Sequence, residues 1–279
     1  MATDSLPGTA AVGRVALTVT DIAEIADFYD SVVGLDIVSE GDDRVVLGAG
    51  DRPLLVLERD HEAPERPREA AGLFHTAFRV PNRAALADAL ARVESEWTLA
   101  GASDHRVSEA LYLWDPEDNG VEIYCDRPRE EWPTADGRVQ MDTLPLDREA
   151  LGEAAAGADG VPAGTDIGHV HLEVTSLEDA RPFYVDALGL GVRQEYNGAL
   201  FVAAGDYHHH VGLNTWNGRS APTSGRGLAW VELTVPDDDA LAATRERLVG
   251  AGVAVTDTDD GIAVSDPDGI RVRVVVASD

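Results

Sequence analysis

The sequence predicts an α+β fold built from four copies of one module, each a strand, a helix and then further strands. Three observations predict it. Segments with alternating apolar and polar residues recur along the chain, and each is followed by a helical pattern. Short strands then close each copy, in two cases after an Asp-Pro turn. The 279 residues are 44% hydrophobic, which is enough to give such modules a real core.

The first module recurs as the third. Both copies share an alternating strand, a polar cap, a Phe-Tyr pair within a helical pattern and a glycine that ends the helix. These features lie at 13–22, Phe28-Tyr29 and Gly34 in the first copy and at 168–177, Phe183-Tyr184 and Gly189 in the third. Further strands are predicted at 44–47, 54–58, 199–203 and 208–215.

The second module recurs as the fourth. An alternating strand at 72–81 matches one at 227–236. Helices rich in alanine and leucine are predicted to follow, at 83–93 and 238–249. Each copy then ends in an Asp-Pro turn and a strand, with Asp115-Pro116 leading to Glu122 and Asp266-Pro267 leading to Arg273.

Two domains are predicted from these repeats. Residues 1–126 form an N-terminal pair of modules (12–59 and 72–126), and residues 166–279 form a C-terminal pair (166–216 and 227–277). The segment between them, 127–165, is rich in proline, glycine, alanine and acidic residues, which predicts a linker with a short helix at 147–156.

The charge of the chain excludes some partners. The formal net charge is -29, and all 22 basic residues are arginine. Such a surface repels nucleic acid and anionic membranes, and its even spread is typical of proteins from salt-loving organisms. The chain holds no apolar run of transmembrane length and no secretory leader, so we expect a soluble, cytoplasmic protein. The single cysteine, Cys125, excludes an internal disulfide framework.

A hairpin in the second module carries the first candidate site residues. Strands at 110–114 and 121–125 flank a turn, and period-2 alternation places Glu122 on the face opposite its two apolar neighbours. His105 and Tyr112 belong to the same hairpin. An imidazole, a phenol and a carboxylate are thus available to one site. The plainer interpretation is that Glu122 and His105 are solvated surface residues.

The four-module layout resembles the vicinal oxygen chelate superfamily, through its Phe-Tyr…Gly-Leu helices and Asp-Pro turns. The resemblance covers nearly the whole chain except the linker. It implies βαβββ modules paired into open mixed β-barrels with flanking helices and a divalent metal in the cleft. Members include glyoxalase I, bleomycin-resistance proteins and extradiol ring-cleaving dioxygenases. Family ligand positions lie on the first and last strands of the paired modules.

The resemblance implies a metal site in modules two and three. The first-strand positions hold Ala16, His75, His171 and Trp230, and the last-strand positions hold Glu122, the run His208-His209-His210 and Arg273. Alanine has no donor atom and arginine brings positive charge, so the predicted ligands are His75, Glu122 and His171. His169 alternates with His171 and is the alternative to it. Two imidazoles and a carboxylate form the triad of non-haem Fe(II) oxygenases, and Mn(II) is compatible with the same ligands.

The resemblance to the extradiol enzymes, in particular the bacterial catechol 2,3-dioxygenase branch, also implies catalytic residues. Their motif of His, Tyr, Asp-Pro and Glu is matched by His105, Tyr112, Asp115-Pro116 and Glu122, although Ser103 and Asp118 depart from the usual residues. His105 and Tyr112 would then face the substrate. A further family histidine acts as acid/base on the strand of the triple-histidine run. Here the prediction is His209 over His210.

The predicted function is an extradiol dioxygenase of aromatic catabolism, with a small aromatic diol and O2 as substrates. The alternatives are a glyoxalase-type metal-dependent isomerase, which would want more carboxylate ligands, and a non-catalytic protein that binds an aromatic molecule. The resemblance to this family also implies that the protein is a homo-oligomer. Each histidine has a plainer interpretation as a core or turn residue, and only their joint occurrence at matched positions favours a metal. The site also requires module two to pair with module three, within one chain or between subunits.

Overall fold

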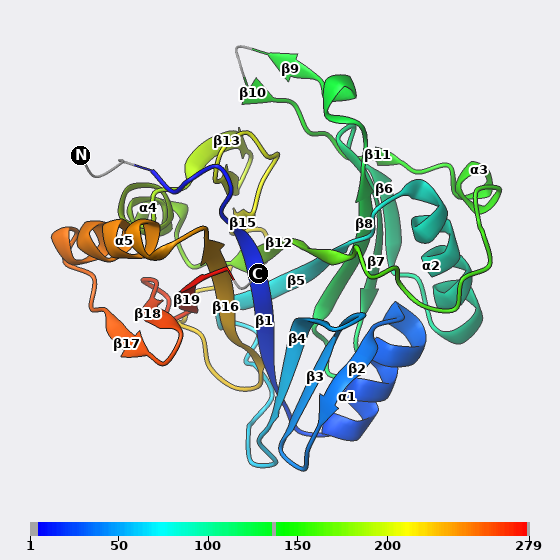
Figure 1. Cartoon of the computed structure of the whole chain (residues 1–279), viewed down its shortest axis with the longest axis horizontal. Helices are drawn as coiled ribbons and strands as arrows, with labels where there is room; N and C mark the ends of the chain where they lie inside the picture. The colour runs from blue at the N-terminus through cyan, green and yellow to red at the C-terminus, as the bar shows by residue number, and fades with distance from the viewer. Residues whose placement is uncertain (1–4, 136–137, 278–279) are drawn as a thin grey trace. The chain divides into compact units, whose positions relative to one another are not determined.

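The computed structural model describes residues 5–135 and 138–277, and it confirms the predicted fold class. Each of the four modules is a strand, a helix and three further strands (Figure 1). The module helices are α1 (Ile22–Phe28), α2 (Arg83–Glu96), α4 (Leu177–Arg181) and α5 (Asp238–Gly250). A π-helical turn continues the first and third of them, η1 (Tyr29–Val33) and η3 (Pro182–Ala187). No helix in the described part of the chain is long and apolar enough to cross a membrane.

The strands form two large mixed sheets, and the strand order tells which modules share a sheet. The eight-stranded sheet has the order β17-β18-β19-β16-β1-β4-β3-β2, from modules four and one. Its strands are β1 (Ala11–Val19), β2 (Asp36–Glu40), β3 (Arg44–Ala49), β4 (Arg52–Arg59), β16 (Gly227–Val235), β17 (Thr256–Thr258), β18 (Gly261–Ser265) and β19 (Arg271–Val276).

The nine-stranded sheet combines modules two and three in the order β11-β6-β7-β8-β5-β12-β15-β14-β13. Its strands are β5 (Gly72–Arg79), β6 (Gly101–Asp104), β7 (Ser108–Trp114), β8 (Gly120–Asp126), β11 (Leu144–Pro145), β12 (Asp166–Glu173), β13 (Gly191–Tyr196), β14 (Ala199–Ala203) and β15 (Val211–Asn214). Modules two and three therefore share one sheet, which is the pairing that the predicted metal site requires.

By the density of internal contacts the chain divides into two compact units. One holds Ala16–Ala63 and His75–Gly168, and the other holds the residues up to Val15, Pro64–Phe74 and the chain from His169 onward. The strands β5 and β12 each contribute residues to both units.

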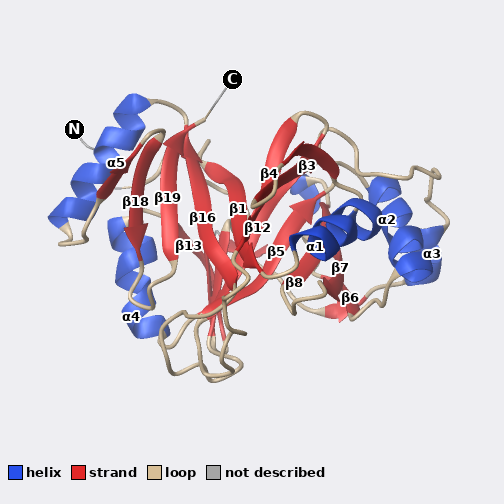
Figure 2. Ribbon diagram, turned by 90° about the horizontal axis from the view of Figure 1, so that it is seen from below, coloured by secondary structure: helices blue, strands red, loops and turns tan. Residues whose placement is uncertain are grey.

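The linker segment belongs to the unit that contains modules one and two. It holds η2 (Arg129–Glu131), a hairpin of β9 (Thr134–Ala135) and β10 (Arg138–Val139), and α3 (Arg148–Gly152). The predicted helix at 147–156 is present in shortened form, capped by Asp147. Figure 2 shows α3 beside α2, which covers one face of the strands of module two.

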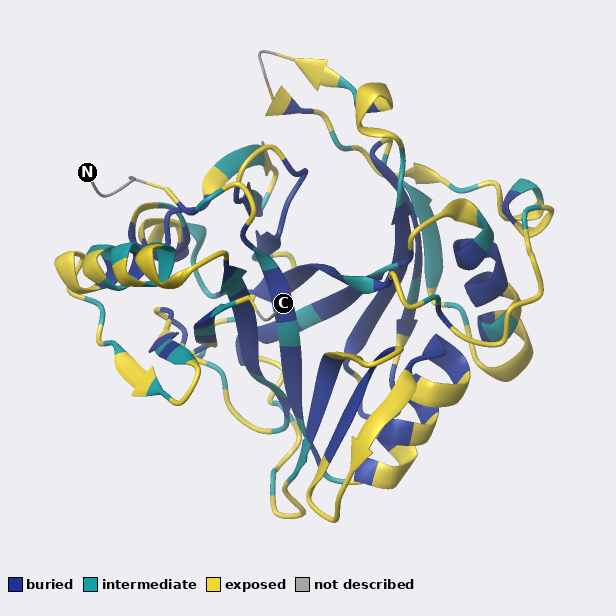
Figure 3. Cartoon of the chain, in the orientation of Figure 1, coloured by how far each residue is buried: buried dark blue, intermediate teal, exposed yellow. Residues whose placement is uncertain are grey.

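The Phe-Tyr and Asp-Pro motifs are linked to each other in the fold. The Tyr29 hydroxyl contacts the Asp115 carboxylate at 3.4 Å, and the Tyr184 hydroxyl contacts Asp266 at 3.0 Å. Each helix tyrosine thus ties its module to the turn of the next one. The side chains of these two tyrosines and two aspartates are all buried. Figure 3 shows that the buried faces of α1 and α2 are turned toward the strands.

These two aspartates should make the protein more stable at mildly acid pH. Burial raises the pKa of Asp115 and that of Asp266 to about 6, above the ordinary value of 3.8. The folded chain therefore binds these protons more tightly than the unfolded chain, so the free energy of unfolding rises as pH falls from about 7 toward about 4. Each group contributes up to about 3 kcal/mol. Denaturant unfolding at molar KCl, where surface repulsion is screened, should show the rise. A free energy of unfolding that stays constant or falls as the pH is lowered from 7 to 5 would contradict the raised pKa values of Asp115 and Asp266.

Candidate metal centre

Module two places a histidine and a carboxylate together. The strands β5 and β8 pair in parallel, with Ala77 opposite Glu122, and His75 precedes Ala77 on the same face. His75 Nε2 lies 2.9 Å from Glu122 Oε2. Only 6% of His75 and 2% of Glu122 is exposed. The plainer interpretation of Glu122 as a solvated strand residue is therefore wrong.

His105 and Tyr112 extend this pair into a chain of polar groups. Tyr112 lies opposite Glu122 in the β7–β8 ladder, and its hydroxyl is 2.6 Å from His105 Nε2. His105 Nδ1 lies 2.6 Å from the carbonyl oxygen of Asp142. Because a carbonyl only accepts, Nδ1 of His105 donates to it. The Nε2 atom is then the one that faces the Tyr112 hydroxyl. Asp142, which the sequence analysis missed, thus sets the tautomer of His105.

The phenol of Tyr112 stays protonated at neutral pH. Burial raises its pKa well above 10, and the nearby charge of Glu122 and its hydrogen bond with that carboxylate raise it further. Tyr112 is therefore a hydrogen-bond donor beside Glu122, not a proton source that ionises by itself.

Module three supplies histidines from β12. His171 lies opposite Gly212 of β15, and a Cβ atom at position 212 would come within 2.5 Å of the imidazole. The glycine is thus needed to admit this ring. Three aromatic side chains surround His171, with centroid distances of 5.3 Å to Phe74, 5.5 Å to Phe201 and 5.2 Å to Trp216.

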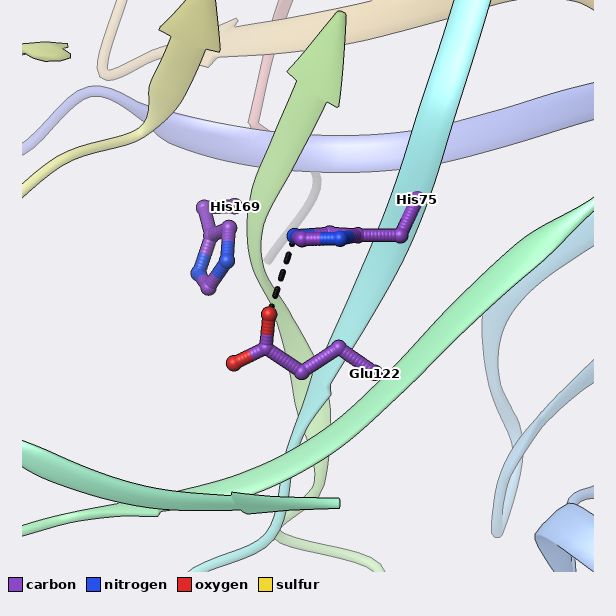
Figure 4. Close-up of side chains that lie close together, drawn as sticks. All are labelled: His75, Glu122 and His169. Atoms are coloured by element: carbon purple, nitrogen blue, oxygen red, sulfur yellow. Dashed lines mark ion pairs between the residues drawn. The ribbon is translucent and has the colours of Figure 1, made fainter. Parts of the chain in front are cut away.

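Three possible metal ligands converge among the described residues, and their third member is His169, the alternative to the predicted His171. Each of His75, Glu122 and His169 offers a donor atom, and these atoms all lie within 4.8 Å of one another (Figure 4). All three residues are buried. Two imidazoles and one carboxylate fit a divalent transition metal and match the triad of non-haem Fe(II) oxygenases. His171 is not a member of this group.

The registers of modules two and three explain why one carboxylate is present and not two. In both modules the first strand pairs in parallel with the last, Ala77 with Glu122 and His171 with Gly212. Gly212 therefore occupies in module three the place that Glu122 occupies in module two. Modules two and three together provide two histidines and a single glutamate at these positions.

The three consecutive histidines do not lie on a strand. The strand predicted at 208–215 is shorter, because β15 begins at Val211. The run therefore lacks the alternation of faces that a strand would give it. His210 Nδ1 accepts a hydrogen bond from the Ala204 amide at 3.1 Å, whereas the His209 ring lies 4.1 Å from the His169 ring. His208 Nδ1 is 2.8 Å from His209 Nδ1.

The matching positions of module four, Trp230 and Arg273, form a cluster with Arg14 of module one. Arg273 lies opposite Glu232 in the β16–β19 ladder, which is the register of Glu122 in module two. The Trp230 ring stacks against Arg14 and Arg273, and Arg14 pairs with Glu232. Asp260 pairs with both arginines, so this cluster is internally neutralised and offers no ligand set for a metal.

Comparisons with known proteins match most of the chain to one family. Residues 11–123 and 166–274 match the family model of the Glyoxalase/Bleomycin resistance protein/Dioxygenase superfamily. A catechol-2,3-dioxygenase from Bacillus subtilis (strain 168) is 40% identical over 266 residues, which cover 92% of this chain and 93% of that protein.

Solved structures with low sequence identity share the fold. A candidate dioxygenase from Bacillus subtilis superposes with a TM-score of 0.68 at 15% identity, covering 98% of this chain and 86% of the other. Glyoxalase I from Zea mays superposes with a TM-score of 0.60 at 15% identity, covering 96% of this chain and 92% of the other.

Proposed function

Because this chain belongs to the glyoxalase/bleomycin resistance protein/dioxygenase superfamily, we propose that it is an extradiol dioxygenase. It would insert O2 into a catechol-type substrate and open the ring beside the two hydroxyl groups, a reaction of aromatic catabolism. The likeness to the Bacillus subtilis catechol-2,3-dioxygenase, at 40% identity over 92% of the chain, supports this chemistry.

The observation that carries the proposal is the composition of the triad. His75, Glu122 and His169 are three buried ligands, and Gly212 stands where a second carboxylate would. Three ligands leave positions open for two substrates, and two imidazoles with one carboxylate suit Fe(II), with Mn(II) as the compatible alternative. A glyoxalase-type isomerase would want a further carboxylate. A metal-free binding protein would gain nothing from burying Glu122 between imidazoles.

Bound iron, held by His75, Glu122 and His169, would supply Lewis-acid and redox chemistry for the diol and O2. Tyr112 then serves as a donor to a substrate oxygen. Its hydroxyl lies beside Glu122, and the His105 ring is fixed by the Asp142 carbonyl so that it can accept or return the phenolic proton. His105 and Tyr112 therefore act as one unit.

We assign the acid/base role to His209. Its ring packs 4.1 Å from that of His169. His210, the other predicted candidate, has its Nδ1 committed to the Ala204 amide and its ring stacked on Tyr207 at 4.9 Å. We therefore give His210 a structural role and withdraw it from the catalytic set.

Metal analysis followed by a catechol assay tests the proposal. The protein is purified without oxygen at high salt, its metal content is measured, and catechol is added in air. Near-stoichiometric iron and a yellow muconate semialdehyde are expected. Bound metal without ring opening would favour the isomerase, and aromatic binding in the absence of metal would favour a binding protein.

Substituting Tyr112→Phe should lower kcat by about 10- to 100-fold, the usual cost of removing a group that orients and polarises a metal-bound substrate. Iron content should stay unchanged, because the phenol is not in the ligand set. Steady-state kinetics with catechol check this. Tyr196→Phe, which removes a phenol that is 63% exposed, is the matched control. Loss of iron from the Tyr112 variant, or unaltered kcat, would disagree with the assigned role.

The acidic composition suggests adaptation to high salt. With a net charge of -29, self-repulsion destabilises the folded chain in dilute buffer. The Debye length falls from about 10 Å at 0.1 M to about 3 Å at 1 M salt, so KCl screens this repulsion. We expect the midpoint of thermal unfolding to rise by several degrees over this range. A midpoint that stays constant or falls in calorimetry would argue against the adaptation.

A further inference from the structure

Residues 207–210 form an irregular segment between β14 and β15 whose side chains are all buried. His208 is completely inaccessible, at 0% exposure. Burying an imidazole this deeply is costly unless its polar atoms are bonded, and an apolar ring would fill the same space without that cost. The position therefore calls for an explanation beyond packing.

The explanation lies in the bond between His208 and His209. Their Nδ1 atoms are 2.8 Å apart. Two nitrogens at this distance share one proton, since two N–H groups or two lone pairs would repel each other. One ring is therefore the Nδ1–H tautomer and the other accepts at Nδ1. The tautomer of each neutral ring is thus coupled to that of its neighbour.

The surroundings hold both rings in place. The His208 ring lies 4.1 Å from the Tyr207 ring. The His209 ring lies between the His169 ring at 4.1 Å and the Phe201 ring at 5.0 Å. Because its Nδ1 is bonded to His208, Nε2 is the nitrogen of His209 that the acid/base role proposed above would use.

We propose that His208 is a positioning residue that fixes the tautomer and the orientation of His209, so that Nε2 of His209 presents one defined state to the substrate. His208 itself does not touch the reacting atoms. The coupling of the two rings stands on the structure alone, and only its use in catalysis rests on the function proposed above.

Nitrogen-15 NMR of the imidazoles in metal-free protein tests the coupling, because the shifts of Nδ1 and Nε2 distinguish the tautomers. In the unchanged protein, one of the two rings should be a pure Nδ1–H tautomer. In His208→Phe and His208→Leu, the His209 signals should move to those of a ring that averages over both tautomers. Two apolar variants are used so that the result does not depend on the folding of one.

His208→Asn is the rescue variant, because the asparagine amide lies where Nδ1 was and can still bond His209. It should restore a single His209 tautomer. His210→Phe is the matched control: it removes a buried imidazole from the same segment, one bonded to the Ala204 amide and not to His209. The His209 signals should be unchanged in this control.

Kinetics of the iron-loaded enzyme give the second readout. The apolar variants should lose about 10- to 100-fold in kcat, the cost of losing a partner that orients a catalytic group. KM for catechol and iron content should be unchanged, and His208→Asn should recover part of the loss. A single His209 tautomer in the folded apolar variants would overturn the proposal. Because the NMR is measured without metal, a failure of ring cleavage in all forms would count against the proposed function and leave the tautomer result standing.

Discussion

Glu122→Gln should abolish ring cleavage by removing the metal. The substitution keeps the shape of the side chain but replaces the single anionic ligand of the triad with a neutral amide. We expect iron affinity to fall by more than about 100-fold, beyond the 10- to 100-fold that losing an outer-shell partner costs. The measurement is metal content after anaerobic dialysis, followed by the catechol assay.

Glu109→Gln is the matched control for this variant. Glu109 is also a buried carboxylate of module two, 6% exposed, but it pairs with Arg83 and Arg127 and lies opposite Cys125. Removing its charge should cost stability because Arg83 loses its carboxylate partner, and iron should remain bound. If Glu122→Gln kept its iron, or Glu109→Gln lost it, the assignment of Glu122 as a ligand would have to be given up.

His169→Ala and His171→Ala together should identify the third ligand. His169 belongs to the group of donor atoms within 4.8 Å, whereas His171 packs among Phe74, Phe201 and Trp216. We expect the iron affinity of His169→Ala to fall by more than about 100-fold, since only two ligands remain. The second variant should keep iron within about threefold, and its defect should appear in KM for the diol.

The two substitutions control for each other, because both remove a buried imidazole from the same strand. Equal unfolding free energies with unequal iron contents would isolate the role of the ligand. The reverse pattern, with iron lost from His171→Ala and kept by His169→Ala, would restore the ligand predicted from sequence.

The difference between His169 and His171 has a physical origin in the glycines that begin the matched strand segments. His75 and His171 lie three residues after Gly72 and Gly168, as Ala16 and Trp230 lie three residues after Gly13 and Gly227. Gly72 and Gly227 have positive φ values of 149° and 113°, which suit a turn into a strand. Gly168 is needed for another reason: a Cβ atom there would lie 1.7 Å from the Tyr124 hydroxyl. The glycines therefore do not occupy equivalent positions in the modules and cannot be used to align the first strands.

Counting from the helix caps gives the correct equivalence. Asn82 and Ser176 cap α2 and α4, and His75 and His169 lie the same number of residues before them. The amides of Val80 and Val174 also make matching bonds, to the carbonyls of Tyr124 in β8 and Asn214 in β15. The signal was present in the sequence, in the capping residues.

The sequence by itself determined the repeat, the helices with their caps, and the kinds of residue available to a metal. These follow from local periodicity and from side chains that bond nearby backbone. The tertiary structure alone decided that module two shares a sheet with module three and that His208 pairs with His209. Strand register and the packing of a buried turn arise from contacts between residues far apart in the chain or in irregular backbone, and one sequence carries no periodic signal for either.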